Sequence, residues 1–171
     1  LTAIAAVACT SVSTTTTLKG KFSGADVPEE VTVTIPGVID TTVRLQNAAF
    51  KIVLPVYKAA FGQVTAGNAA GRFIADGTTL TANLNDGLLS VNSEKPSVSL
   101  TEKFNAFVED HQALVASYRT QMAAISDSTG LSDQQKDSLK EEFYNEFSEK
   151  YSSFNMDAVK SNMDNVISTV A

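Results

Sequence analysis

Hydrophobic and polar positions alternate with a period of two through the middle of the chain, between Leu18 and Val91. Such alternation, in short runs rich in Val, Ile and Thr, is typical of strands with one buried face. We predict eight strands, at Leu18–Phe22, Val31–Ile35, Thr41–Gln46, Phe50–Pro55, Phe61–Ala66, Gly71–Ala75, Thr79–Leu84 and Leu88–Val91.

The segments between these runs carry residues that tolerate positive φ: Asn47-Ala48-Ala49, Gly67-Asn68, Asp76-Gly77 and Asn85-Asp86-Gly87. Turn residues at a spacing of about 8–12 residues favour an antiparallel β-sandwich or barrel. One face of each strand is apolar, so the sheet requires a second sheet or a helix against it.

The period changes to about 3.5 residues from Ser99 onward, which predicts helices. Ser99-Leu100-Thr101-Glu102 has the form of a capping box, and Ser132-Asp133-Gln134-Gln135 has the form of a second one. The apolar stripe of the first helix comprises Phe104, Val108, His111, Val115, Tyr118, Met122 and Ile125, and that of the second comprises Leu139, Phe143, Phe147, Tyr151 and Phe154.

A third helical segment is predicted from Met156, Val159, Met163, Val166 and Val170. The short loop between the first two helices predicts an antiparallel hairpin. The fold class is therefore α+β: a β-sandwich or barrel of about eight strands, followed by a helical hairpin and a third helix.

The two stripes hold more large apolar groups than a helix pair alone covers. We therefore expect the rest of the hairpin's apolar surface to pack against the β-region, the third helix or a second copy. If Phe143 lies in such a core, Phe143→Ala is expected to cost about 3–5 kcal/mol.

The first nine residues bear on location. Leu1–Ala8 is apolar and resembles the end of a signal peptide, and Ala6-Val7-Ala8-Cys9 resembles a bacterial lipobox, in which the cysteine carries lipid. A buried cysteine in a first strand is the alternative. We expect residues 1–17 to comprise the signal remnant, lipobox and a Ser/Thr tether (Thr10–Thr17), residues 18–95 a β-domain and residues 96–171 the helical region. No acidic run follows Cys9, which favours a periplasm-facing lipoprotein.

Composition narrows the range of partners and chemistry. The net charge is −6, the pI is about 4.7 and basic residues are dispersed, so nucleic acid is an unsuitable partner. A single cysteine cannot form a dithiol centre or an intrachain disulfide. No run approaches the roughly 20 apolar residues that span a bilayer.

The order of these segments resembles the N-terminal region of bacterial thioredoxin-like lipoproteins of the TlpA/ResA type. "LKGKFSG", "IDTTVRLQNAAFKIVLP" and "FIADGTTLTANLN" carry the likeness. The family often has Gly-x-Phe where this chain has Asn47-Ala48-Ala49-Phe50, so one of its marks is missing. The resemblance implies a β-domain of unknown function ahead of a thioredoxin domain, which would follow Ala171.

The sequence favours a non-enzymatic protein without metal or cofactor. His111 is the single histidine and lies on the apolar stripe of a helix, where a packing role is expected instead of a catalytic one. Two functions remain open. The chain is a lipid-anchored envelope module that positions or binds a partner of a thiol–disulfide oxidoreductase, or it is a stand-alone lipoprotein that binds a ligand, glycan or protein through its β-domain. The oligomeric state is left open.

Three Asp-Ser/Thr sites resemble acceptors of bacterial O-glycosylation: Ser128, Thr41 and Ser138. Each follows an aspartate, as Asp127, Asp40 and Asp137. Ordinary turn and helix-start chemistry is the alternative explanation for all three sites.

Overall fold

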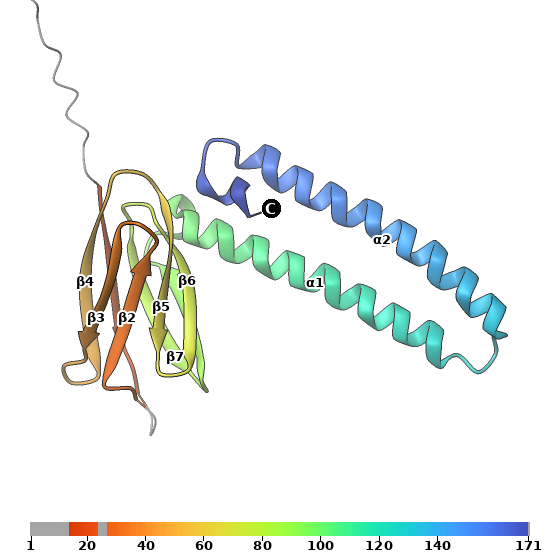
Figure 1. Ribbon diagram of the computed structural model, residues 1–171, viewed down its shortest axis with the longest axis horizontal. Coiled ribbons are helices and arrows are strands. Elements are labelled where there is room, and N and C mark those ends of the chain that lie inside the picture. Colours follow the sequence, from red (N-terminus) through yellow and green to blue (C-terminus); the bar gives the residue numbers. More distant parts are fainter. Residues whose placement is uncertain (1–13, 24–26, 171) are drawn as a thin grey trace, which may run out of the picture. The chain divides into compact units, whose positions relative to one another are not determined.

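A computed structural model describes residues 14–23 and 27–170 (Figure 1). The chain divides into two compact units, with the boundary between Thr101 and Glu102. We call them the β unit and the helical unit. This order confirms the predicted α+β class, with an N-terminal β-region and C-terminal helices.

The β unit contains eight strands within the described residues. They are β1 (Thr14–Lys21), β2 (Glu30–Ile35), β3 (Ile39–Arg44), β4 (Ala49–Val56), β5 (Ala60–Ala66), β6 (Ala69–Ala75), β7 (Thr79–Asn85) and β8 (Leu88–Ser93). They form two four-stranded sheets in the orders β4-β1-β7-β8 and β3-β2-β5-β6. Each of the eight predicted strands is present.

Two features of the sheets differ from the prediction. β1 begins at Thr14, which lies opposite Val56 of β4. The predicted Ser/Thr tether is therefore wrong for residues 14–17, which belong to a strand. β1 also pairs with β7 in parallel, Leu18 lying opposite Leu80, whereas the other strand pairs are antiparallel. The sheet that contains β1 therefore combines parallel and antiparallel strand pairs.

The core lies between the two sheets and takes side chains from both of them. Leu18, Leu54 and Leu80 of one sheet and Val33, Val64 and Phe73 of the other are fully buried in one cluster. These positions alternate with more exposed ones along the strands, which explains why a period-two pattern locates the strands. Gly62 lies under the ring of Phe73, where an added Cβ would come within 2.4 Å of that ring.

The sandwich is closed along the side where β6 faces β8. A Cβ on Gly71 of β6 would lie 2.9 Å from the carbonyl oxygen of Leu89 in β8, so only glycine permits this approach of the two backbones. Turns of positive φ join several strands, at Asn47, Ala48, Gly67, Gly77, Asp86 and Gly87. These turns lie within the segments predicted from the sequence, whereas the β2–β3 turn at Gly37, also of positive φ, is not among them.

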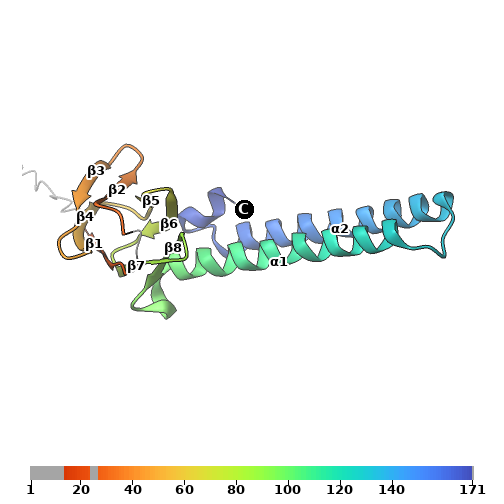
Figure 2. The ribbon, with the colours of Figure 1, turned by 90° about the horizontal axis from the view of Figure 1, so that it is seen from below.

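The helical unit consists of a hairpin and one short turn. α1 (Leu100–Asp127) begins at the end of the β unit, and α2 (Asp133–Ser161) follows a loop of five residues. The two helices run side by side (Figure 2), each about 42 Å long at ~1.5 Å per residue. Ser132 accepts a hydrogen bond from the Gln135 amide while the Gln135 side chain accepts one from the Ser132 amide, which confirms the predicted capping box.

The predicted third helix is wrong. Met156 and Val159 belong to α2, which ends at Ser161. A single 3₁₀ turn, η2 (Val166–Thr169), follows it, and the Asn165 side chain caps this turn by accepting from the Ile167 amide. Another 3₁₀ turn, η1 (Pro96–Val98), precedes α1.

Candidate functional site

A polar junction holds the end of the β unit together. The carboxylate of Asp76 accepts hydrogen bonds from the Thr78 amide (3.0 Å) and hydroxyl (2.6 Å), the Ser99 hydroxyl (3.3 Å) and the Leu100 amide (2.6 Å). Ser99 accepts in turn from the Thr101 amide at 3.2 Å. Asp76 therefore satisfies a backbone amide at the start of α1 that has no partner within the helix.

Thr101 extends the junction to the free edge of β6. Its hydroxyl accepts from the Ile74 amide at 2.9 Å and donates to the Ile74 carbonyl at 3.1 Å, and Thr101 is fully buried. The Thr101 side chain thus makes the hydrogen bonds to Ile74 that a neighbouring strand would otherwise make. Thr16, also buried, accepts from the Gly77 amide at 2.8 Å. These groups are all satisfied by the chain itself, so the junction is structural.

Aromatic side chains line the seam between α1 and α2. Phe107 stacks on Phe154 with ring centroids 5.3 Å apart, and Tyr118 stacks on Phe147 at 4.2 Å and on Phe143 at 5.5 Å. Positions that rise along α1 meet positions that fall along α2, which confirms the antiparallel hairpin. No residue of α2 is buried, so the aromatic side chains of α2 are only partly covered at the seam.

His111 lies on this seam as predicted. Its Nε2 is 3.0 Å from the Tyr151 hydroxyl, and its ring lies near those of Phe107 and Phe154. Among the residues that the structure describes, no group of three or more His, Cys, Asp or Glu side chains is placed to hold a metal ion. The surroundings of His111 are those of a packing residue.

Two open grooves lie on the hairpin. One of about 410 Å³ is lined by Leu131, Gln134, Gln135, Ser138 and Leu139. The other, of about 530 Å³, is lined by His111, Gln112, Val115, Ala116, Arg119 and Thr120. Neither groove brings together the paired acid and base, or nucleophile and base, that catalysis requires.

The residues predicted for modification lie in different surroundings. Cys9 lies outside the described residues. Thr41 lies opposite the buried Val33 and is half-buried on β3, and Ser128 is half-buried in the α1–α2 loop. Ser138 is exposed on α2, so it is the most accessible hydroxyl of the three.

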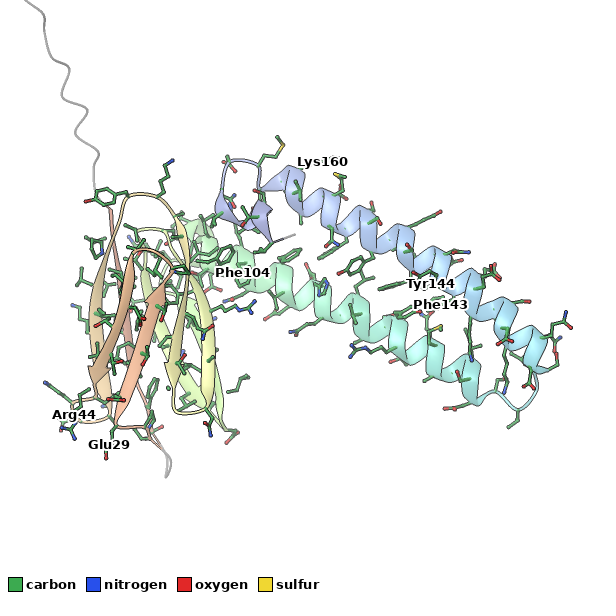
Figure 3. All side chains as sticks on the ribbon, in the orientation of Figure 1. Glu29, Arg44, Phe104, Phe143, Tyr144 and Lys160 are labelled. Atoms are coloured by element: carbon green, nitrogen blue, oxygen red, sulfur yellow. The ribbon has the colours of Figure 1, made fainter. Side chains whose placement is uncertain are left out.

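The two ends of the sandwich carry different exposed side chains, a feature that sequence patterns do not indicate. Val38, Tyr57 and Val98 are exposed by 53%, 75% and 64%, and they lie in or next to the turns at the end where β1 starts. At the opposite end, Arg44 pairs with Glu29 at 3.4 Å, and both side chains are exposed (Figure 3). Only the pairing of the strands shows which turns share an end.

Comparison with known proteins does not indicate a family or a function for this chain. No family model matches the chain, and no curated protein matches it. Among solved structures, an NMR structure of a protein from Eubacterium rectale is similar over 51% of this chain and 93% of its own, with 14% identity and a TM-score of 0.34. A likeness at that level carries no argument about function. No helix in the described residues is long and apolar enough to span a membrane.

Proposed function

We propose that this chain is a non-catalytic, lipid-anchored module of the bacterial cell envelope that positions or binds another protein. The anchor would be lipid on Cys9, and the module would face the periplasm. The partner that the sequence resemblance implies is a thioredoxin-like thiol–disulfide oxidoreductase, either as a downstream domain or as a separate envelope protein.

The exposure of the helical hairpin is the observation that carries the binding role. α2 is 29 residues long and none of them is buried, although its seam is lined with aromatic groups. Tyr144 (labelled in Figure 3) and Met156 are both more than half exposed on α2. A long helix pair with so little of its surface covered suits an arm that contacts another protein.

The test of the anchor is metabolic labelling with an alkynyl fatty acid in the native host, comparing the wild type with Cys9→Ala. We expect label on the wild type alone, because the variant lacks the acceptor thiol. Equal label on both proteins, or none on either, would contradict the anchor.

The test of the arm is a photoreactive phenylalanine analogue placed at Tyr144, with the same analogue at Phe147 as the matched control. Phe147 faces the seam and stacks on Tyr118, so it reaches a partner poorly. We expect a discrete cross-linked species from position 144 and little from position 147. Equal cross-linking at both positions would show that the hairpin does not present one face to a partner.

A stand-alone binding protein is the second candidate function, and the outer face of the β2–β3 sheet favours it. Thr32 and Thr42 are 3.0 Å apart there, and Thr34 donates to Asp40 at 3.5 Å. Rows of exposed hydroxyl and carboxylate groups can bind a glycan through hydrogen bonds. Binding of a glycan that Thr32→Val abolishes would favour this function over the first.

A further inference from the structure

The pairing of the strands assigns each turn of the sandwich to one of two ends (Figure 1). Thr14 lies opposite Val56, which places the start of β1 beside the β4–β5 turn. Thr34 lies opposite Gln63, so the β2–β3 turn is beside the start of β5. The Glu94 amide donates to the Thr79 carbonyl, so the segment from Lys95 to Val98 lies here too. We call this the Tyr57 end.

The other end comprises the turns at Leu45–Ala48, Gly67–Asn68 and Asp86–Gly87, and we call it the Leu88 end. Lys21 lies opposite Ala49, and Asn85 lies opposite Leu88. β1 and β7 are parallel, with Gly20 beside Ala82, so the last residues of both strands lie at this end.

Exposed apolar side chains gather at the Tyr57 end. Among the large hydrophobic residues of the β unit that are exposed in the described structure, Val38, Tyr57 and Val98 lie there, whereas Leu88 alone lies at the opposite end. Val53 is exposed on the outer face of β4. A tyrosine among aliphatic groups on protruding turns has the composition that membrane interfaces favour.

The Tyr57 end carries charges of both signs. Lys58 and Lys95 are exposed, and neither forms an ion pair within the described residues. Three carboxylates lie there too: Asp76 accepts four hydrogen bonds, the exposed Asp40 accepts one from Thr34, and Glu94 pairs with Lys19. The Leu88 end exposes Glu29, Glu30 and Asp86 together with the basic Lys21 and Arg44, and Arg44 pairs with Glu29. Net charge therefore does not distinguish the two ends, and Lys58 and Lys95 are the groups of the Tyr57 end that would contact anionic headgroups.

The distance from Cys9 to the folded domain is short. Since β1 begins at Thr14, only four residues separate it from Cys9. Five Cα–Cα steps at ~3.3–3.6 Å each reach at most about 18 Å. An anchor on Cys9 would thus bring the Tyr57 end, and not the Leu88 end, to the bilayer surface.

We propose that the Tyr57 end is a membrane-docking surface. Tyr57, Val38 and Val98 enter the interfacial region of the bilayer, while Lys58 and Lys95 contact anionic headgroups. This inference rests on the lipid anchor of the proposed function, because the anchor selects which end meets the membrane.

The chain offers a clean experiment because it has one cysteine and no tryptophan. Cys9 is coupled to a maleimide-headgroup lipid in vesicles of phosphatidylglycerol and phosphatidylcholine with brominated acyl chains. Tyr57→Trp is the reporter, and Leu88→Trp, at a site of similar exposure (72% against 75%), is the matched control. We expect the indole emission of the Tyr57→Trp protein to fall by about half and shift to shorter wavelength, because indole within the interface contacts brominated chains. The emission of the Leu88→Trp protein should be unchanged.

The lysines are tested in the Tyr57→Trp protein with Lys58→Gln or Lys95→Gln. Each removed charge should lower the ratio of docked to undocked protein about fivefold on anionic vesicles, with no further change on vesicles of phosphatidylcholine alone. A second reporter that keeps the tyrosine uses Val38→Trp, and circular dichroism of each variant confirms that it folds.

Equal quenching of the Tyr57→Trp and Leu88→Trp proteins, or quenching of neither, would overturn the proposal. Quenching of neither, together with a dimer in sedimentation, would assign this end to a second copy of the chain. The coupling to lipid is chemical, so a failure of fatty-acid labelling in the host contradicts the native anchor but leaves the docking result independent of it.

Discussion

Sixteen buried hydrophobic residues form one core in the described part of the β unit, whereas none of the 29 residues of α2 is buried. The charges divide in the same way. Residues up to Thr101 include seven basic and seven acidic groups, and those from Glu102 onward include six basic and twelve acidic groups, so the second part carries the net −6. The β unit is thus neutral with a closed core, and the helical unit is acidic with a half-covered seam.

This difference follows from geometry. Two sheets cover both inner faces of a sandwich, so its apolar side chains leave water completely. Two helices cover only one stripe of each other, and the flanks of the seam stay wet. We therefore expect the free energy of unfolding of the β unit to depend on its core far more than that of the hairpin depends on any single aromatic group.

The largest effect is expected for Phe73→Ala. Phe73 is fully buried and packs over Gly62, so its removal leaves a cavity that the sheets cannot fill. We expect a loss of about 3–5 kcal/mol in the free energy of unfolding of the β unit, measured by urea denaturation. A loss below about 1 kcal/mol would contradict the closed core.

Thr101→Val should have the next largest effect. The substitution keeps the side-chain shape but leaves the buried amide and carbonyl of Ile74 without partners. We expect a loss of about 2–3 kcal/mol. Thr120→Val is the control: its hydroxyl donates to the Ala116 carbonyl on an exposed face, and its removal should be nearly neutral. Equal effects from both substitutions would mean that the junction contributes nothing particular.

Tyr118→Ala tests the seam of the hairpin. The ring stacks on Phe143 and Phe147 but is only half-buried, so we expect a loss of about 1–2 kcal/mol. For the same reason Phe143→Ala should cost less than the roughly 3–5 kcal/mol expected of a core residue, since Phe143 is only half-buried. Tyr144→Ala, on the exposed side of α2, should change little. Helicity followed by circular dichroism during thermal unfolding gives these values.

Arg44→Ala should have the smallest effect. The ion pair of Arg44 with Glu29 spans 3.4 Å, and the two side chains are 82% and 85% exposed. Solvent screens such a pair, so the change in free energy of unfolding should stay below about 0.5 kcal/mol. A larger change in urea denaturation would show that this end of the sandwich is held by more than its backbone.

Much of the fold can be predicted because strands such as β2 and β8 alternate buried positions with more exposed ones. The start of β1 is not predicted as a strand because Thr14–Thr17 is uniformly polar, which is typical of a loop. In the structure Thr16 is nevertheless fully buried and accepts a hydrogen bond from the Gly77 amide. The parallel pairing of β1 with β7 joins segments about 60 residues apart, and alternation within a strand carries no information on its neighbours.

For the helices, the sequence pattern predicts the elements but not where the second helix ends. Met156 and Val159 continue the phase of α2, and the break that would separate a third helix lies later, at Asn162–Asn165. The Tyr57 end cannot be predicted, since Val38, Tyr57 and Val98 come together only once the strand pairing is known. The acceptor role of Asp76 toward Leu100 likewise depends on a contact between distant segments.

Native-state hydrogen exchange of the whole chain tests most directly the claim that the two units differ in stability. We expect amides of β2 and β5, at the centre of one sheet, to exchange only with global unfolding of the β unit, while amides along α2 exchange through local opening at a much lower free energy. Equal protection of α2 and of these central strands would contradict this expectation.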